Sequence, residues 1–515
     1  MKTLGRIFLL SCIFLIGSSC LLNANNVQIT SGVTLTGQDV TNDYIYVTFD
    51  IAWDNSWRDA TNWDAVWVFF KFSNNNAWKH GYLSTDKTEY SIGTNNGVVP
   101  AFSVGSTTVG SGSNGMGVFI YRNAEGAGSV NWQTVKLKWY YGQNGLNDEQ
   151  AANASIKLFA IEMVYVPTAS FELGCGSTGG FFTRNYANST TTYSTIPSYY
   201  YTIGSESAIN ARGEQVSGSS GGFLSWSNYY SATTIPASFP KGYAAFYCMK
   251  YEITQEQYVE FLNSLQPAQQ SSRVSAVTVG KYMSSASTTE SPQYRNGIRC
   301  MVVPTTTTAG TWGCDLNGNG TCGESDDGQN VACNYIRWSD AIAYADWAGL
   351  RPMTELEYEK ASKGSEHIPA QYAWGTVNVS AVTSISNSGK ADEVSGTVGA
   401  NAVYSNQAGV QGPMRVGCFA TGVSSRESAG ASYYGIMELS GNVAEQTVYV
   451  TSTFDGVAGD GELYSNGNTD ISTWTVGISY RGGSWASDAS SLQSGYRSST
   501  SSGECNGFRC VRTAQ

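Results

Sequence analysis

Residues 434–445 read Tyr434-Gly435-Ile436-Met437-Glu438-Leu439-Ser440-Gly441-Asn442-Val443-Ala444-Glu445. Like most of the chain after Gly364, this segment mixes glycine with aromatic, apolar and small polar residues and keeps no long helical or strand period. Helices are few in this region, and Gly/aromatic pairs are frequent. We therefore predict an α+β domain of short strands whose shape is set by loop packing.

Upstream of that segment, first-turn signals predict helices. Two of the helices begin with a capping box, in which a Thr hydroxyl and a Gln or Glu three residues later satisfy each other's backbone N–H groups. In the first helix, apolar residues follow the spacing i, i+3, i+4, i+7, which gives one buried face. The predicted helices run from Thr254 to Leu265, from Ser339 to about Trp347 and from Thr354 to about Ser362.

The composition excludes several classes of function. Lysine and arginine number 29 against 40 aspartates and glutamates, and the net charge of −11 argues against a nucleic-acid-binding protein. A length of 515 residues and a hydrophobic content of 41% leave room for several folded domains. The only histidines are His80 and His367. Two histidines cannot build a multi-histidine iron or zinc site.

The region from residue 25 to about 160 has a different pattern. Runs rich in β-branched and aromatic residues alternate with turn-forming Ser, Asn and Gly, which is typical of an antiparallel sandwich. We therefore expect an all-β, sandwich-like domain ahead of the loop-rich domain. The strongest runs are residues 44–51, 65–72, 117–121, 135–140 and 156–160.

From residue 161 to 515, a series of blocks resembles the formylglycine-generating enzyme (sulfatase-modifying factor) family. The blocks stand in the order of that family, and the resemblance implies its variant of the C-type-lectin-like fold, interrupted by an insertion at about 280–332. The blocks are residues 163–167, 171–174, 246–254, 338–341, 347–351, 354–359, 372–375, 434–445, 481–485 and 507–509.

The resemblance does not extend to the catalytic cysteines. Oxidases of the family carry two cysteines shortly after the Gly-Gly-Ser-aromatic block, and these thiolates hold copper(I), a soft ion that prefers sulfur. The corresponding positions here fall near Ser487 and Leu492, and no cysteine stands between Cys418 and Cys505. Copper is therefore not expected. The iron-dependent branch of the same fold needs more histidines than this chain has.

Residues 484–504 line the ligand groove in the proteins that this chain resembles. Here the segment offers small hydroxyls, a few polar groups and one guanidinium, which suit hydrogen-bonded recognition of a protein or glycan. A merely hydrophilic loop is the alternative. The residues expected to bind a ligand are Arg481, Trp485, Ser487, Asp488, Tyr496 and Arg497.

Within the insertion, residues 315–326 fit a twelve-residue calcium loop. Oxygen ligands stand at positions 1, 3 and 5, a glycine at position 6 allows the sharp turn, and position 7 supplies a carbonyl. The alternative is a solvated Asx-turn loop closed by a Cys314–Cys322 disulfide. The predicted ligands are Asp315, Asn317, Asn319, Thr321 and Asp326.

The resemblance implies a second calcium site, because family members bind calcium through a segment shaped like residues 438–445. Side-chain oxygens would come from Glu438 and Glu445, and backbone carbonyls from Gly441 and Val443. Relatives often have Asn where Glu438 stands, so this site carries one more negative charge. Two solvated carboxylates without a metal are the alternative.

The N-terminus reads as an export signal. Lys2 and Arg6 precede an apolar run from Ile7 to Ile16, which is too short to span a bilayer. Cleavage after Ala24 is favoured over lipidation at Cys20, because a lipobox normally has Leu where Gly17 stands. No later segment has 18 consecutive apolar residues, so no transmembrane segment is expected.

Export also governs the cysteines. In an oxidising compartment most of the nine cysteines that follow the signal would form disulfides, with at least one left over.

Together these patterns predict an exported, calcium-stabilised, non-catalytic protein that recognises an extracellular protein or glycan, with secretion, the periplasm or the cell surface as its location. Two alternatives remain open. One is a formylglycine-generating oxidase acting on a sulfatase-type cysteine. The other is a self-assembling structural subunit of an envelope or filament.

Overall fold

The fold is taken from a computed structural model of the chain. It describes residues 26–74, 77–109, 112–175, 182–187, 193–195, 200–211, 223–225, 233–274, 278–284, 290–450 and 453–515. The signal segment and Cys20 lie outside these ranges. Among the described residues, no helix is long and apolar enough to cross a membrane.

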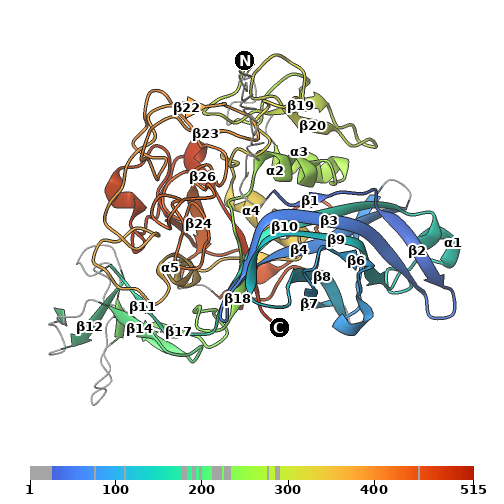
Figure 1. The fold of residues 1–515 in the computed structure, drawn as a ribbon, viewed down its shortest axis with the longest axis horizontal. Helices are drawn as coiled ribbons and strands as arrows, with labels where there is room; N and C mark the ends of the chain where they lie inside the picture. The colour runs from blue at the N-terminus through green and yellow to red at the C-terminus, as the bar shows by residue number, and fades with distance from the viewer. Residues whose placement is uncertain are drawn as a thin grey trace, which may run out of the picture.

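A large antiparallel sheet dominates the first third of the chain (Figure 1). Its central path runs β21-β27-β18-β10-β4-β3-β9-β6, and the remaining members pair at its sides. The strands are β1 (Gln28–Ile29), β2 (Thr34–Asp39), β3 (Tyr44–Arg58), β4 (Trp63–Asn74), β5 (Ala77–His80), β6 (Thr94–Asn95), β7 (Pro100–Val109), β8 (Gly112–Arg122), β9 (Gly126–Trp139), β10 (Ser155–Val166), β18 (Phe246–Met249), β21 (Arg351–Pro352) and β27 (Cys510–Thr513). Four of the five runs predicted as strands lie within one of them, and the fifth, residues 135–140, ends one residue beyond β9.

Strand β4 is buried on both faces, which explains its almost unbroken apolar sequence. Val66, Val68 and Phe70 pack with residues of β3 and β9 in one core. Trp67 and Phe69 point the other way, because side chains alternate along a strand, and they join a core that contains helix residues from the C-terminal half. The β-rich layers and the loop-rich region therefore share this strand.

The expected boundary at residue 160 lies inside β10. This strand pairs along its length with β4, from Ser155 opposite Ser73 to Tyr165 opposite Trp63. Its second half also pairs with β18, from Met163 opposite Met249 to Val166 opposite Phe246. Hydrogen bonding thus continues without a break from the β-rich region into the loop-rich region.

The helices begin where their first turns predict. Both Thr-led capping boxes are formed, at Thr254 with Gln257 and at Thr354 with Glu357. The first helix ends three residues earlier than expected, at Leu262, and a further helix follows. The bounds are α1 (Asp148–Ala152), α2 (Gln255–Leu262), α3 (Pro267–Arg273), α4 (Trp338–Trp347) and α5 (Glu355–Lys363), with short 3-10 turns η1 (Lys87–Glu89), η2 (Ser472–Trp474), η3 (Ala489–Leu492) and η4 (Gly503–Cys505).

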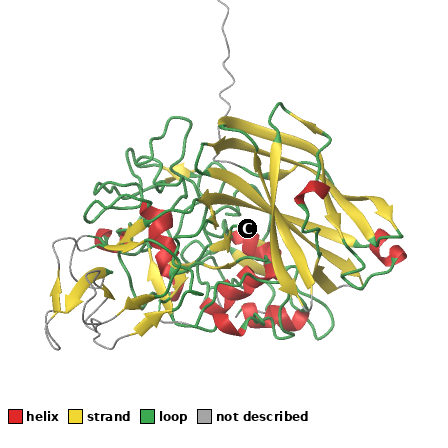
Figure 2. Cartoon of the chain, turned by 90° about the horizontal axis from the view of Figure 1, so that it is seen from below, coloured by secondary structure: helices red, strands yellow, loops and turns green. Residues whose placement is uncertain are grey.

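The remaining strands are short and belong to small separate sheets, so loops make up most of the C-terminal half (Figure 2). One of these sheets, in the order β25-β24-β26, contains Glu445 and Arg481. The strands are β11 (Phe171–Leu173), β12 (Thr183–Ala187), β13 (Tyr193–Thr195), β14 (Tyr201–Ile203), β15 (Ile209–Ala211), β16 (Phe223–Ser225), β17 (Thr233–Ile235), β19 (Ile298–Val302), β20 (Thr311–Cys314), β22 (Ile385–Ser386), β23 (Val394–Ser395), β24 (Ala444–Val448), β25 (Ile478–Arg481) and β26 (Asn506–Gly507).

Candidate functional site

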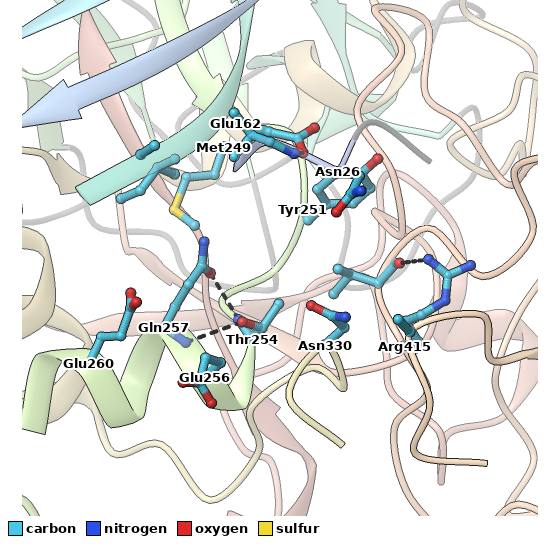
Figure 3. Close-up of a pocket in the computed structure, with 15 residues that line it drawn as sticks. Asn26, Glu162, Met249, Tyr251, Thr254, Glu256, Gln257, Glu260, Asn330 and Arg415 are labelled. Atoms are coloured by element: carbon cyan, nitrogen blue, oxygen red, sulfur yellow. Dashed lines mark hydrogen bonds between the residues drawn. The ribbon is translucent and has the colours of Figure 1, made fainter. Parts of the chain in front are cut away.

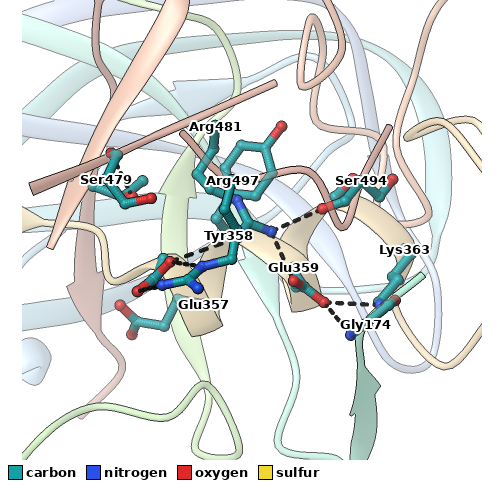
Figure 4. Close-up of polar contacts among 12 residues, drawn as sticks. Gly174, Glu357, Tyr358, Glu359, Lys363, Ser479, Arg481, Ser494 and Arg497 are labelled. Carbon is teal, nitrogen blue, oxygen red and sulfur yellow. Dashed lines mark hydrogen bonds and ion pairs between the residues drawn. The ribbon is translucent and has the colours of Figure 1, made fainter. Parts of the chain in front are cut away.

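A buried ionic network lies beneath the predicted recognition segment (Figure 4). Arg481, the last residue of β25, donates to Glu359 at 2.8 Å and to the Ser494 carbonyl at 2.9 Å. Arg497 donates to both carboxylate oxygens of Glu355, at 2.5 and 2.7 Å. Both acids come from α5, so this helix anchors the chain on either side of the segment.

Charge pairing favours the ionised form of Glu359 despite its burial. Burial alone would raise the pKa of the Glu359 carboxyl, but the cations Lys363 and Arg481 hold it below its usual value. Lys363 lies 2.9 Å from Glu359, and the Gly174 amide donates to the same carboxylate at 2.8 Å. The network therefore fixes the position of the segment and has no free cation to offer a ligand at Arg481.

Two of the six predicted ligand-binding residues are internal. Arg481 has no exposed surface, and Trp485 is 3% exposed with its indole N–H donating to the Glu504 carbonyl. Asp488 is exposed, and Ser487 and Tyr496 are partly exposed, whereas the Arg497 side chain is only 6% exposed and is paired with Glu355. The outer surface of the segment lies mainly in residues 486–491, in Tyr496 and in residues 498–504.

A cavity of about 250 Å³ opens between the sheet and α2 (Figure 3). It is lined by three acids, Glu162, Glu256 and Glu260, together with Tyr251 and Arg415. Burial raises the pKa of Glu256, and the start of the described chain reaches the cavity, where the Val27 amide donates to Glu162 at 3.3 Å. Sequence reasoning did not find this cavity, because its lining comes from six separate segments.

The sulfatase-modifying factor enzyme 1-like domain family matches residues 207–514. The chain belongs to this family. Formylglycine-generating enzyme of Thermomonospora curvata is 45% identical over 49 residues, which cover 10% of this chain and 16% of that relative. The match thus spans about a sixth of the relative's length.

Within this family fold, the positions assigned to the oxidase cysteines are filled by other chemistry. Leu492 has no exposed surface and packs with Tyr372 and Trp374. Its carbonyl accepts a hydrogen bond from Ser440 at 2.7 Å. The Ser487 hydroxyl lies 3.1 Å from that of Ser484. A leucine side chain has no metal-binding atom, and a hydroxyl is a poor ligand for copper(I).

All nine cysteines in the described residues are free, so the expected disulfides are not formed, and neither is the Cys314–Cys322 bond of the alternative to the calcium loop. Eight of them are buried, and Cys314 instead contacts the Glu256 carboxylate at 3.4 Å. Burial raises the pKa of the Cys505 thiol, although Ser484 hydrogen-bonds to it. These thiols pack as small hydrophobic side chains.

The two histidines lie in different surroundings. His80 is fully buried, and its ring nitrogens lie 3.0 Å from the Lys71 amine and 2.6 Å from the Met116 carbonyl. His367 is largely exposed, with one ring nitrogen 3.6 Å from Glu172. Neither belongs to a cluster of three or more metal-ligating residues within the described ranges.

Residues 438–445 place two acids in a buried, mostly polar setting. Glu438 accepts from the Gly417 amide at 2.8 Å, and Glu445 lies 2.7 Å from the Arg509 guanidinium. The second carboxylate oxygen of each acid has no hydrogen-bond partner among the described residues. Burial raises the pKa of Glu438 to about 7. The donor chemistry suits a hard cation such as calcium.

The other two predicted ligands of this site lie on the same turn. Gly441 has φ of +98°, a conformation in which a side chain would be strained, and a Cβ there would come 2.7 Å from the Val403 carbonyl. The Val443 amide donates to the buried Glu252 at 3.0 Å. Glu252 thus adds a third carboxylate near this turn, which sequence reasoning missed.

In the insertion, the structure brings two of the predicted calcium ligands, Asn317 and Asp326, into contact. The Asn317 amide nitrogen lies 3.0 Å from Asp326 and 3.3 Å from Glu324. Carboxylate oxygens of Glu324, Asp326 and Asp327 lie within 4.8 Å of one another. Glu324 and Asp327 were not predicted as ligands. Their positions close to position 12 of the motif could have indicated them.

Proposed function

We propose that this chain is an exported, non-catalytic recognition or cell-surface protein built on the sulfatase-modifying factor fold. Membership of the family gives the chain its scaffold. The residues at the positions of the oxidase cysteines argue against oxidase chemistry. The observation that carries the proposal is Leu492, an apolar side chain with no exposed surface at a position where the resemblance implies a copper ligand.

The state of the other thiols supports the same conclusion. Copper binding and attack on a substrate cysteine both need a thiolate, which low thiol pKa values favour. Burial instead raises the pKa of Cys418 and of Cys510 well above the usual value, and it raises that of Cys505. A thiol that keeps its proton is a poor substitute for the cysteines missing near Ser487 and Leu492.

The proposed contact surface is the exposed turn from Ser487 to Ser491 with Tyr496 beside it. Hydroxyls, the Asp488 carboxylate and one aromatic ring can exchange hydrogen bonds with a glycan or a protein. The ion pairs of Arg481 and Arg497 with α5 hold this turn from below, so little ordering entropy is lost when a ligand binds.

Calcium is part of the proposal at residues 438–445. Three buried acids, Glu252, Glu438 and Glu445, face one directly paired guanidinium, that of Arg509. A divalent cation held by Glu438 and Glu445 would offset the excess charge, and the carbonyls of Gly441 and Val443 would complete the ligand set.

Catalysis is tested by incubating the chain with a Cys-x-Pro-x-Arg peptide, copper and oxygen. A formylglycine-generating relative run in parallel serves as the positive control. We expect no aldehyde product by mass spectrometry. Turnover by this chain would overturn the non-catalytic assignment.

Recognition is tested on glycan and extracellular-protein arrays. We expect selective binding that the substitution Asp488→Asn weakens at least tenfold. The substitution Asp43→Asn makes the same chemical change at an exposed site in the β-rich region and should leave binding unchanged. Binding that neither substitution affects would place the contact surface elsewhere, and absence of any ligand would favour a structural role.

A further inference from the structure

We propose that residues 315–327 form a cation site that takes calcium, with Asp327 and Glu324 as ligands beside the positions that the loop motif predicts. The proposal is independent of what the protein recognises. It rests on the fold of the loop, on the charge that the loop gathers, and on two buried carboxylate oxygens that are left without partners.

The backbone of the loop wraps around Asp315. This residue has no exposed surface, and its Oδ2 atom accepts from the Gly320 amide at 3.1 Å and from the Tyr282 hydroxyl at 2.8 Å. Asn317 and Asn319 each accept from the amide two residues ahead, at 2.9 and 2.7 Å. These turns direct successive oxygen-bearing side chains toward one region, as a calcium loop requires.

The loop then supplies more negative charge than its surroundings balance. Four carboxylates stand within thirteen residues, those of Asp315, Glu324, Asp326 and Asp327. The cation nearest to them in an ion pair is Arg299, 3.5 Å from Asp315. Bringing carboxylates this close without a cation between them costs free energy through like-charge repulsion.

Two carboxylate oxygens of the loop indicate that it binds a ligand, because hydrogen bonds within the turn do not satisfy them. Asp315 Oδ1 and Asp327 Oδ1 are buried and have no hydrogen-bond partner among the described residues. Both residues have no exposed surface. An unpartnered buried carboxylate oxygen is expensive, and a divalent cation bound in the loop would supply the partner that such an oxygen lacks.

A second acidic group in the chain shows the contrast. Asp346 lies close to Asp460 and Asp470. Its two carboxylate oxygens are already engaged, one by the Thr469 hydroxyl at 2.5 Å and the other by the Asp460 amide at 3.2 Å. That group therefore lacks the unpartnered oxygens that mark the loop at residues 315–327.

Calcium at this loop would fasten the insertion to helix α2. The Gln255 and Glu256 amides, in the first turn of α2, donate to the carbonyls of Val331 and Gln329, just after the loop. The Gln255 side chain also donates to the Arg295 carbonyl, which precedes β19 and β20 in the insertion. A cation that orders the loop would therefore also support the hydrogen bonds between the insertion and α2.

The test is isothermal titration of calcium chloride into the full, metal-stripped chain carrying Glu438→Gln, which removes the other proposed calcium site. We expect binding with a Kd of about 0.1–1 mM, the range of extracellular calcium modules. Asp327→Asn should weaken this binding at least tenfold. Asp43→Asn, the matched change at an exposed site, should leave it unchanged.

Because Asp327 is buried, a second variant guards against loss of folding. Asp326→Asn alters a partly exposed carboxylate of the same group and should weaken binding at least threefold, with an unchanged circular dichroism spectrum. The proposal is wrong if no binding occurs up to about 10 mM calcium, well above the Kd range of such sites. It is equally wrong if both variants bind calcium as tightly as their parent.

Discussion

At the scale of single residues, the chain tolerates buried charge where partners surround it. Lys71, in the middle of β4, is 2% exposed and donates to the Gly461 carbonyl at 2.7 Å. Burial lowers the pKa of its amine to about 7, although the nearby acids Glu462, Asp346 and Asp460 partly oppose this. The folded state therefore disfavours the protonated amine of Lys71, and the stability of the fold depends on pH at this residue.

An unfolded lysine titrates near pH ~10.4, so between pH 7 and 10 the unfolded chain binds more protons at this position than the folded chain. The stability that the neutral amine permits is therefore lost as pH falls from about 10.4 to about 7. The free energy of unfolding of the wild-type chain should fall by about 3 kcal/mol between pH 9.5 and pH 7, at about 1.4 kcal/mol per pKa unit. Lys71→Met should not show this loss. Urea unfolding at the two pH values measures this.

The exposed neighbour Lys79 offers the control for this measurement. Lys79→Met should change stability by the same amount at both pH values. If the difference between Lys71→Met and wild type were flat across this pH range, Lys71 would have to be charged in the folded protein.

At the scale of elements, helix starts are decided by local chemistry. In α5, the Thr354 hydroxyl accepts from the Glu357 amide at 3.1 Å, and the Glu357 carboxylate accepts from the Thr354 amide at 3.0 Å. Glu357 also pairs with Arg351 at 2.6 Å. The cap therefore joins the start of the helix to the edge of the large sheet.

Removing the cap should cost a measurable part of the stability. Thr354→Ala is expected to lower the free energy of unfolding by about 1–2 kcal/mol, because the Glu357 amide and the Pro240 carbonyl both lose a partner. Thr354→Ser keeps the hydroxyl and should cost less than half as much in urea denaturation. Equal losses from the two changes would mean that the threonine methyl group, and not the cap, is responsible.

At the scale of the whole molecule, Trp67 joins the β-rich region to the family domain. Its indole N–H donates to the Ala348 carbonyl at 2.9 Å, and the Arg512 guanidinium lies over its ring at 5.2 Å. The ring also leaves no room for a side chain at Gly105 or Gly117, where a Cβ would come within 2.8 Å of it. The two regions therefore meet through close packing and shared hydrogen bonds.

This coupling predicts a single thermal transition by scanning calorimetry. Trp67→Ala should shift that whole transition to lower temperature, with a loss of about 3–5 kcal/mol from the cavity and the lost burial. Trp78→Ala removes an indole that is only partly buried on β5 and should shift it much less. Two transitions, of which Trp67→Ala moves only one, would show that the regions unfold independently.

Features set by neighbouring residues could be predicted from the sequence. The capping boxes located the starts of α2 and α5, and continuous apolar runs located the long strands, because both signals act within a few residues. The family blocks predicted the fold family that the match over residues 207–514 shows. The acidic loop at residue 315 was recognisable from its spacing, although the two acids around position 12 were missed.

The tertiary structure decided what depends on contacts between distant segments. Arg481 and Trp485 read as ligand-binding residues, yet ion pairs and packing with α5 and η4 turn them inward. The boundary drawn at residue 160 lies inside β10, because β18 continues the sheet from a segment some 80 residues later in the chain. The nine cysteines of the described residues, most of which were expected to pair, are free thiols, and eight of them are buried. Sequence alone determines local hydrogen bonding and apolar pattern; burial and pairing between remote segments arise only when the chain has folded.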